Sequence, residues 1–396
     1  MPLLFLIVFI NLMGFGVVIP LMPFYVLHLG AGPELIILIF SFYSGAQFVT
    51  APIWGRLSDK YGRKPILAWT MLATVLSYII LAYADSLWML VLSRFVGGVA
   101  AGNIGISFAY MTDITTEEDR SKGMGLLGAA FGLGFIVGPA IGGILAGPDV
   151  ATADYFTPAI VAAALSLVAY IGIVTLLPES LKPDVRARLA QQKPVPLLRQ
   201  ISTVMSRRVL FMLVAIGFLF TSAWALLEAI LGFWTNAQFN YGPTHVGYLL
   251  VWMGTISVFI QGFLIGPLTR RFGEQNLLMT AMAISLVGFV ALAASTTLVT
   301  LLLSTALLSI SSGLFNPTAS SLVSKESTEE NRGVVLSVYQ GAGSLARMIG
   351  PAFAGPVFVW IGASVPFLVA AGLMVPCWFL MQRIIRRQRP AASTPG

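Results

Sequence analysis

The sequence is poor in charge, in cysteine and in histidine, and each shortage removes a class of protein from consideration. Charged residues make up 10% of the 396 residues, against about 25% in an ordinary soluble domain. A soluble chain of this length could not cover its surface with so few charges. The single cysteine excludes a disulfide framework. With two histidines, no HExxH motif and no GxxxxGK[ST] loop, the sequence predicts no metal site, no cofactor, no enzyme active site and no use of ATP.

Apolar residues supply 57% of the chain instead, and they gather in runs near the ~20 residues that cross a bilayer as a helix. The alternating pattern of membrane β-strands is absent. The sequence therefore predicts an all-α integral membrane protein with twelve transmembrane helices, at 3–26, 34–54, 66–84, 87–111, 122–145, 156–177, 209–233, 246–268, 276–295, 297–321, 333–358 and 361–382.

Basic residues lie almost entirely on one side of these spans. That side holds 21 of the 23 Lys and Arg residues, whereas the opposite loops hold none and carry Asp85, Asp149 and Asp154. Under the positive-inside rule both termini are cytoplasmic. This topology accounts for the net charge of +7, so the charge does not indicate nucleic-acid binding. We expect a multi-pass protein of a bacterial cytoplasmic (inner) membrane that contacts the lipid bilayer and works as a monomer.

The two halves of the sequence repeat each other. Residues 55–62 (GRLSDKYG) are echoed 211 residues later by residues 266–273 (GPLTRRFG), and residues 116–120 (TEEDR) are echoed 212 residues later by residues 328–332 (TEENR). Because six spans separate the copies, both enter the membrane in the same orientation. We therefore predict two pseudo-symmetric six-helix bundles, an N-terminal one at 1–178 and a C-terminal one with a short basic tail at 208–396, joined by a charged cytoplasmic linker at 179–207.

The most specific motif is GRLSDKYGRK at residues 55–64, between the second and third spans. Its glycines allow a tight turn between two helices, and its basic residues hold the loop on the cytosolic side. Asp59 is then an acid in a basic neighbourhood, so we expect it to find a partner there. The residues that we single out in this motif are Gly55, Asp59, Gly62, Arg63 and Lys64.

With this motif the chain resembles a transporter of the major facilitator superfamily, in the drug:proton antiporter branch that contains the tetracycline-efflux proteins. The resemblance covers essentially the whole chain and implies transport by alternating access. It also implies that Asp59 meets the N-terminal end of helix 11, where the helix dipole favours an anion, and that Arg63 pairs with Asp113 at the end of helix 4. This relay, with which we group Arg120, would latch the cytoplasmic side shut. The alternative is a solvated loop whose charges only set topology.

Helix 5 is rich in glycine at spacings near four residues. Small residues at such spacings let helix backbones approach closely in a membrane, so the direct interpretation is a tight helix contact. The resemblance adds that this glycine-rich helix is a signature of the antiporter branch, which favours export over uptake. The signature residues are Gly134, Gly138, Pro139, Gly142 and Gly143.

Helices 1 and 4 each carry a polar residue at an unusual place. Arg94 lies about seven residues into its span, roughly 10 Å deep, and an arginine at that depth by default marks function. The alternative is a structural arginine that hydrogen-bonds backbone carbonyls of helix 1. Asn11 stands where tetracycline exporters typically have an aspartate, and helix 9 also lacks the aspartate found there. The two missing acids argue against tetracycline as the substrate and require a coupling acid elsewhere.

Glu228, in helix 7, is the one acid that the predicted spans place well inside the membrane. Helix 7 lines the central cavity in the family, so we expect Glu228 to bind and release the coupling proton. Arg347 in helix 11 would be its partner or a counter-ion for an anionic substrate, and Arg94 is a further coupling candidate. The alternative for Glu228 is a structural carboxylate. The residues that we expect to line the substrate cavity are Asn11, Tyr43, Gln47, Asn103, Phe220 and Trp224.

Taken together, these features predict a secondary transporter that exports small, largely apolar organic compounds in exchange for protons. One alternative is uptake, or transport of a sugar or metabolite, which would need a more polar cavity. Another is uniport without protons. A membrane-embedded enzyme would need a catalytic or metal-binding cluster that the sequence lacks.

Overall fold

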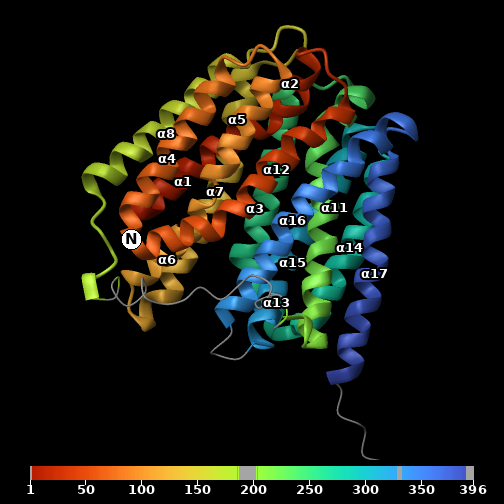
Figure 1. Cartoon of the computed structure of the whole chain (residues 1–396). Helices are drawn as coiled ribbons and strands as arrows, with labels where there is room; N and C mark the ends of the chain where they lie inside the picture. Colours follow the sequence, from red (N-terminus) through yellow and green to blue (C-terminus); the bar gives the residue numbers. More distant parts are fainter. Residues whose placement is uncertain (1, 185, 187–201, 203, 328–331, 389–396) are drawn as a thin grey trace, which may run out of the picture. The chain divides into compact units, whose positions relative to one another are not determined.

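The computed structural model describes residues 2–184, 186, 202, 204–327 and 332–388, and the elements in these residues are all helical. In chain order they are α1 (Pro2–Val18), η1 (Ile19–Leu21), α2 (Met22–His28), η2 (Pro33–Leu35), α3 (Ile36–Tyr61), α4 (Arg63–Ala82), α5 (Leu87–Ala100), α6 (Asn103–Asp113), α7 (Glu117–Ala146), α8 (Phe156–Leu176), α11 (Arg208–Phe239), α12 (Pro243–Phe259), the π-helical η3 (Ile260–Leu264), α13 (Ile265–Phe272), α14 (Glu274–Ala293), α15 (Leu298–Lys325), α16 (Arg332–Trp360) and α17 (Val365–Gln388) (Figure 1).

Twelve helical segments in the described residues are long and apolar enough to cross a membrane, which confirms the predicted number. Their cytoplasmic ends differ from the sequence prediction, because several helices continue beyond the apolar run. Helix α3 ends at Tyr61 instead of residue 54, and α15 ends at Lys325 instead of residue 321. Hydropathy marks only the part of a helix that lies in hydrocarbon, whereas the backbone hydrogen-bond ladder continues into the polar turns beyond it.

The fourth predicted span is two helices in the structure. Helices α5 and α6 are separated by a turn at Ala101 and Gly102. A Cβ atom on Gly102 would lie 2.7 Å from the Trp54 ring and 3.0 Å from the Ala51 Cα atom. The break therefore occurs where α3 comes closest, and only glycine leaves room for that approach.

The chain forms two compact units that do not follow the sequence order strictly. One unit contains Met1–Lys193, Ala229–Gly254 and Ala354–Val359, and the other contains Pro194–Glu228, Thr255–Phe353 and Trp360–Gly396. The bundle boundaries at residues 178 and 208 stay a prediction. Most of the predicted linker, and residues 328–331 of the second TEENR copy, lie outside the described residues.

Each unit contains the same packing pattern, which supports the internal repeat. In the first unit α4 packs against α5 and α8, and in the second unit α14 packs against α15 and α17. Helices α4 and α14 are the third spans of their halves, and Figure 1 shows each beside its partners. The two helices also begin alike, after Gly62 at φ 105°, ψ 157° and after Gly273 at φ 77°, ψ 154°. These are conformations that side-chain-bearing residues rarely adopt.

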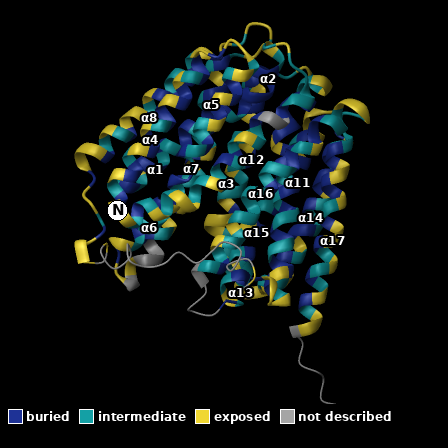
Figure 2. Cartoon of the chain, viewed as in Figure 1, coloured by how far each residue is buried: buried dark blue, intermediate teal, exposed yellow. Residues whose placement is uncertain are grey.

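Burial changes from one face of a helix to the other, although both faces are apolar. On α4, Leu67 and Met71 are buried, whereas Trp69 and Leu76 are 65% and 52% exposed. Figure 2 shows the same mixture of buried and exposed residues along the other helices. A soluble helix would place polar side chains on its exposed face. An exposed face of tryptophan and leucine instead fits contact with lipid.

Candidate functional site

Arg63 is the centre of a charge relay at the junction of α3 and α4. Its side chain is 9% exposed, and its Nη1 atom lies 2.6 Å from Asp59 Oδ1 while its Nε atom lies 3.2 Å from Asp113 Oδ2. Nη1 also donates to Ser58 Oγ at 2.7 Å. A charge-assisted contact on each side fixes the plane of the guanidinium. The Arg63–Asp113 pairing that the resemblance implies is thus present, and its role as a latch stays a prediction.

Glu179 completes this junction, and sequence reasoning missed it. Its carboxylate accepts hydrogen bonds from the backbone N–H groups of Arg63 at 2.8 Å and Lys64 at 3.1 Å. These are first-turn donors of α4, which have no partner within the helix. Ser180 adds a hydrogen bond from its Oγ atom to Asp113 Oδ2 at 3.0 Å. The only sequence signal was an acid directly after the sixth span, because 116 residues separate Glu179 from Arg63.

Three other members of the predicted relay contribute less. The turn between α3 and α4 is made at Gly62, whereas Gly55 lies inside α3 with open space where a Cβ atom would be. The expectation that Gly55 serves a turn is therefore wrong. Lys64 contributes its backbone N–H to the Glu179 contact. The side chain of Arg120 lies outside the described residues.

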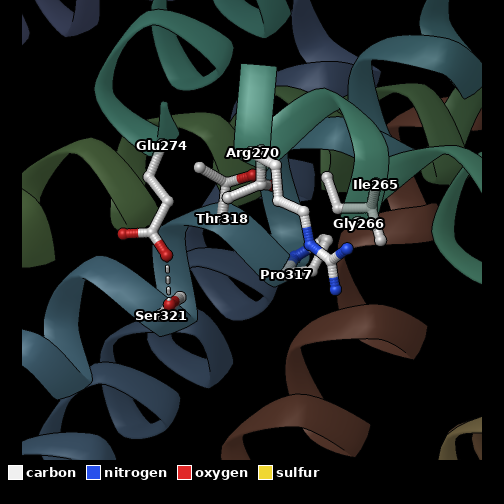
Figure 3. A pocket seen from close by; sticks show the side chains of 8 residues that line it. Ile265, Gly266, Arg270, Glu274, Pro317, Thr318 and Ser321 are labelled. Atoms are coloured by element: carbon white, nitrogen blue, oxygen red, sulfur yellow. Dashed lines mark hydrogen bonds between the residues drawn. The ribbon is translucent and has the colours of Figure 1, made fainter. Parts of the chain in front are cut away.

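The second half contains the counterpart of this relay with every charge reversed. The matching positions, 211 or 212 residues apart, are Asp59 and Arg270, Arg63 and Glu274, and Asp113 and Lys325. Glu274 Oε1 accepts hydrogen bonds from Lys325 Nζ at 2.8 Å and from Ser321 Oγ at 2.6 Å. Arg270 has no ion pair within the described part of the chain, and Figure 3 shows its side chain directed away from Glu274. The repeat offset was the signal that could have found this group.

A pocket of about 340 Å³ opens beside the reversed relay, between α13, α14 and α15 (Figure 3). Its walls include Gly266 and Thr269 of α13 and Pro317 and Ser321 of α15, with Arg270 at one side. The volume is at the lower end of the range for small-molecule sites. The pocket is polar at the relay and apolar beside Pro317, so it could admit water or an amphipathic solute.

The glycines of the antiporter signature make the contact between α7 and α1. A Cβ atom on Gly134 would lie 2.7 Å from Leu12 Cβ, and one on Gly138 would lie 2.6 Å from Met13 O. A Cβ atom on Gly142 would collide with Val17 O. Real Cβ atoms do not approach backbone atoms this closely, so the two helices touch backbone to backbone. This is the tight helix contact that the spacing predicts.

Gly138→Ala should destabilise the fold by about 1–3 kcal/mol, because the added methyl group meets backbone that cannot move away cheaply. Gly128 offers a matched control in the same helix, since nothing lies within 4 Å of its Cβ position. Thermal unfolding of the purified variants in detergent measures the difference. We expect a lower Tm for Gly138→Ala and an unchanged or higher Tm for Gly128→Ala. Equal Tm values would show that the contact is not tight.

Gly143 points instead to α12, within the same unit. Thr244 donates from Oγ1 to Gly143 O at 2.6 Å and from its backbone N–H to Gly147 O at 3.3 Å. A Cβ atom on Gly247 would lie 2.6 Å from Pro139 O. The last turns of α7 and the first turns of α12 therefore touch through backbone atoms as well. The signature glycines serve two helix contacts at once.

Glu228 and Arg347 lie in the second unit and interact electrostatically. They make no direct ion pair among the described residues, and Arg347 Nη2 donates to Ser344 Oγ at 3.2 Å. The Glu228 side chain is exposed although its neighbours Leu227 and Ala229 are 1% and 0% exposed. Glu228 is eleven residues from the nearer end of α11, so an exposed carboxylate at that depth must face water or solute and not lipid.

Arg94 lies in the first unit without any acidic partner. It is 4% exposed, its Nε atom donates to Ser93 Oγ at 3.3 Å, and its guanidinium lies 5.7 Å from the centre of the Tyr78 ring. Its Nη2 atom has no hydrogen-bond partner among the described residues, which include the whole of α1. The structure therefore holds the arginine by a cation–π contact and not by the carbonyls of helix 1.

The predicted cavity residues fall into two groups. Asn11 and Asn103 meet across α1 and α6, where Nδ2 of the first donates to Oδ1 of the second at 3.5 Å. Gln47 donates to Ala101 O at 3.5 Å, and Tyr43 contacts Phe15 at a ring distance of 5.5 Å. In the other unit Phe220 is 2% exposed and stacked on Phe315, so it packs in the interior. Trp224 is half-buried, and its Nε1 atom has no hydrogen-bond partner in the described residues.

Comparison with known proteins agrees with this geometry. A model of the Major Facilitator Superfamily matches residues 4–263 and 236–396. The class C tetracycline resistance protein of Escherichia coli is 27% identical over 388 residues, which cover 94% of each chain. Multidrug resistance protein 2 of Bacillus subtilis (strain 168) is 29% identical over 373 residues, covering 93% of this chain and 90% of that protein.

A solved structure is similar over the same extent. The crystal structure of the human organic anion transporter MFSD10 (TETRAN) matches with a TM-score of 0.70 and 25% identity, covering 96% of this chain and 98% of that one. The family consists of transporters, which confirms the prediction that the chain is not an enzyme. The protein is a multi-pass membrane transporter of the major facilitator superfamily, the family that its helix 2–3 motif predicts.

Proposed function

We propose that this transporter exports small, largely apolar organic compounds in exchange for protons, by alternating access. The observation that carries the proposal is the position of Glu228. It is the one carboxylate that the described spans hold far from either end, its side chain is exposed, and the charge of Arg347 acts on it. A group in this position can bind a proton from one side and release it to the other.

Two further observations support export. The relatives from Escherichia coli and Bacillus subtilis are named for tetracycline and multidrug resistance. The antiporter signature of helix 5 is complete, and its glycines make the α1 and α12 contacts described above. Because Asn11 replaces the aspartate of tetracycline exporters, we place the substrate outside the tetracyclines.

We also propose that the protein lies in a bacterial cytoplasmic membrane as a monomer with both termini in the cytoplasm. The distribution of basic residues supports this orientation, since 21 of the 23 fall on the side of the charge relay and the C-terminal tail. In this arrangement the two six-helix bundles are residues 1–178 and 208–396. The charged linker at 179–207 then lies on the cytoplasmic side.

A second candidate function is transport of an organic anion, in either direction. Arginines outnumber acids deep in the spans, where Arg94 and Arg347 stand against Glu228 alone. Arg94 has no acidic partner, and a buried cation without one could be neutralised by a substrate carboxylate. MFSD10, the relative of known structure, is named an organic anion transporter.

A susceptibility panel in an efflux-deficient bacterial host separates these candidates. Cells with and without the gene are challenged with tetracycline, chloramphenicol, ethidium and tetraphenylphosphonium. Export of apolar compounds predicts a raised inhibitory concentration for at least one of the last three, which a protonophore removes. An unchanged panel, together with uptake of a labelled organic anion by the same cells, would favour the second candidate.

A further inference from the structure

Two carboxamide side chains, Gln261 and Asn316, are exposed inside the spans of the second unit. Gln261 donates from Nε2 to Ser257 Oγ at 2.9 Å, and Asn316 donates from Nδ2 to Ser312 Oγ at 3.1 Å. In both cases the serine stands one turn earlier on the same helix. The carbonyl oxygen of neither amide has a donor among the described residues. Each amide therefore keeps one acceptor and one N–H free.

Both amides lie at hydrocarbon depth. Gln261 precedes the end of α13 at Phe272 by eleven residues, and Asn316 precedes the end of α15 at Lys325 by nine residues. At 1.5 Å per residue these distances are roughly 17 and 14 Å along the helix axes. An amide moved from water to hydrocarbon without a hydrogen-bond partner costs about 4–8 kcal/mol. Exposed amides at this depth must therefore face water or a polar solute, and not lipid.

The two amides belong to helices that touch. A Cβ atom on Gly313 of α15 would lie 2.9 Å from Ile260 Cβ and 3.2 Å from Ser257 O. Ser257, Ile260 and Gln261 share one face of their helix, and Ser312, Gly313 and Asn316 share the facing one. The contact coincides with the π-helical turn η3, residues Ile260–Leu264. Such turns widen a helix locally and are frequent at functional sites.

The pocket of Figure 3 lies next to this pair. Ile265 of its wall directly follows η3, and Pro317 directly follows Asn316. The pocket thus begins one residue from each side of the amide pair and extends along the same two helices to Arg270 and Ser321. It provides a route from the cytoplasmic ends of α13 and α15 to the two amides.

We propose that Gln261 and Asn316 form a hydrogen-bonding subsite, entered through the pocket between α13, α14 and α15, for an uncharged hydroxyl, carbonyl or amide group of the transported compound. The inference rests on the proposed transport of drug-like molecules and narrows their class. An apolar compound that carries such a group matches the free acceptor and N–H of each amide. A compound without hydrogen-bonding atoms gains nothing from them.

Thiol labelling tests access to the subsite independently of transport. In a Cys377→Ser background, Gln261→Cys and Asn316→Cys are treated with a membrane-impermeant sulfonated maleimide in inverted membrane vesicles. Val287→Cys on α14 is the matched control, because Val287 is 54% exposed and thirteen residues from Glu274, roughly 20 Å along its helix. We expect labelling at 261 and 316 and none at 287. If 261 and 316 resist labelling as 287 does, the amides are closed to water and the proposal is wrong.

Transport of two probes then tests the chemistry. Chloramphenicol carries hydroxyl and amide groups, whereas tetraphenylphosphonium carries no hydrogen-bonding atom. We expect Gln261→Leu and Asn316→Leu to raise the apparent KM for chloramphenicol at least about tenfold and to leave that for tetraphenylphosphonium within about twofold. Asn276→Leu, which removes an exposed amide at the cytoplasmic start of α14, should change neither value.

The remaining outcomes are also decisive. Equal loss for both probes in the leucine variants would assign the amides a structural role and overturn the proposal. Wild-type transport of tetraphenylphosphonium without chloramphenicol would overturn it as well. If the wild type moves neither probe, the proposed export function fails, and the labelling pattern alone decides whether the amides face a water-filled route.

Discussion

Glu228→Gln should abolish export driven by a pH gradient while the protein still folds and still exchanges substrate. Glutamine keeps the size and hydrogen bonding of a protonated glutamate but cannot release a proton. Because the Glu228 side chain is exposed within its span and is influenced by the charge of Arg347, its charge state can change with the side that it faces. We expect gradient-driven accumulation in inverted vesicles to fall at least about tenfold, which is about 1.4 kcal/mol of lost coupling. Substrate counterflow without a gradient should persist.

Two companion variants separate coupling from structure. Glu228→Asp should keep partial gradient-driven activity, because the carboxylate survives at a shorter reach. Glu228→Gln combined with Arg347→Gln leaves no unbalanced charge and should restore any expression lost by the single variant, without restoring coupling. Full gradient-driven transport by Glu228→Gln would contradict the assignment. Coupling would then run through Asp113 or Glu34 near the helix ends, or the protein would be a uniporter.

Asp59→Asn should impair transport strongly while expression stays near the wild-type level. The substitution removes the charge that faces Arg63 Nη1 at 2.6 Å without changing the volume of the side chain. Arg63 keeps its contacts with Asp113 at 3.2 Å and Ser58 at 2.7 Å, so the junction of α3 and α4 should hold together. The Asp59 side chain is 39% exposed, and a pair exposed to this extent contributes about 1 kcal/mol or less to stability. Initial rates of drug efflux, normalised to protein in the membrane, measure the effect.

Controls for this variant come from the same side of the membrane and from the repeat. Asp184→Asn removes an exposed acid just after the sixth span, and we expect normal efflux. Arg270→Ala alters the counterpart position, where the arginine has no ion pair in the described residues, and should have a smaller effect than Asp59→Asn. A wild-type efflux rate for Asp59→Asn would argue against a latch. Equal loss at both positions would point to a simple effect on topology.

The number of spans and the repeat could be read from the sequence because both depend on local properties. Apolar runs and a fixed offset of 211 or 212 residues survive in any arrangement of the helices. The turn at Ala101 and Gly102 and the π-helical turn at Ile260–Leu264 could not be read in this way. Both arise where another helix approaches, at Trp54 in one case and at Gly313 in the other. Hydropathy carries no information about such contacts.

The candidate site was predictable to the extent that its parts follow one another in the chain. The motif at residues 55–64 and the signature glycines gave the Arg63 relay and the α1–α7 contact. Glu179 and the Glu274–Lys325 pair were missed, because each joins residues that are far apart in sequence. The exposure of Gln261 and Asn316 was missed for a different reason. An amide in an apolar run reads as a tolerated polar residue until the structure shows that it is accessible.

The most direct measurement of the central claim follows the lumenal pH of proteoliposomes that contain the purified protein. A compound that the susceptibility panel identifies is added outside, with no pH gradient imposed, and its entry is followed in parallel by a radioactive label. Antiport predicts that lumenal pH rises as the compound enters, because each entry releases protons outward, and that Glu228→Gln removes the rise. Entry of the compound with a constant lumenal pH, or with a falling one, would contradict proton antiport.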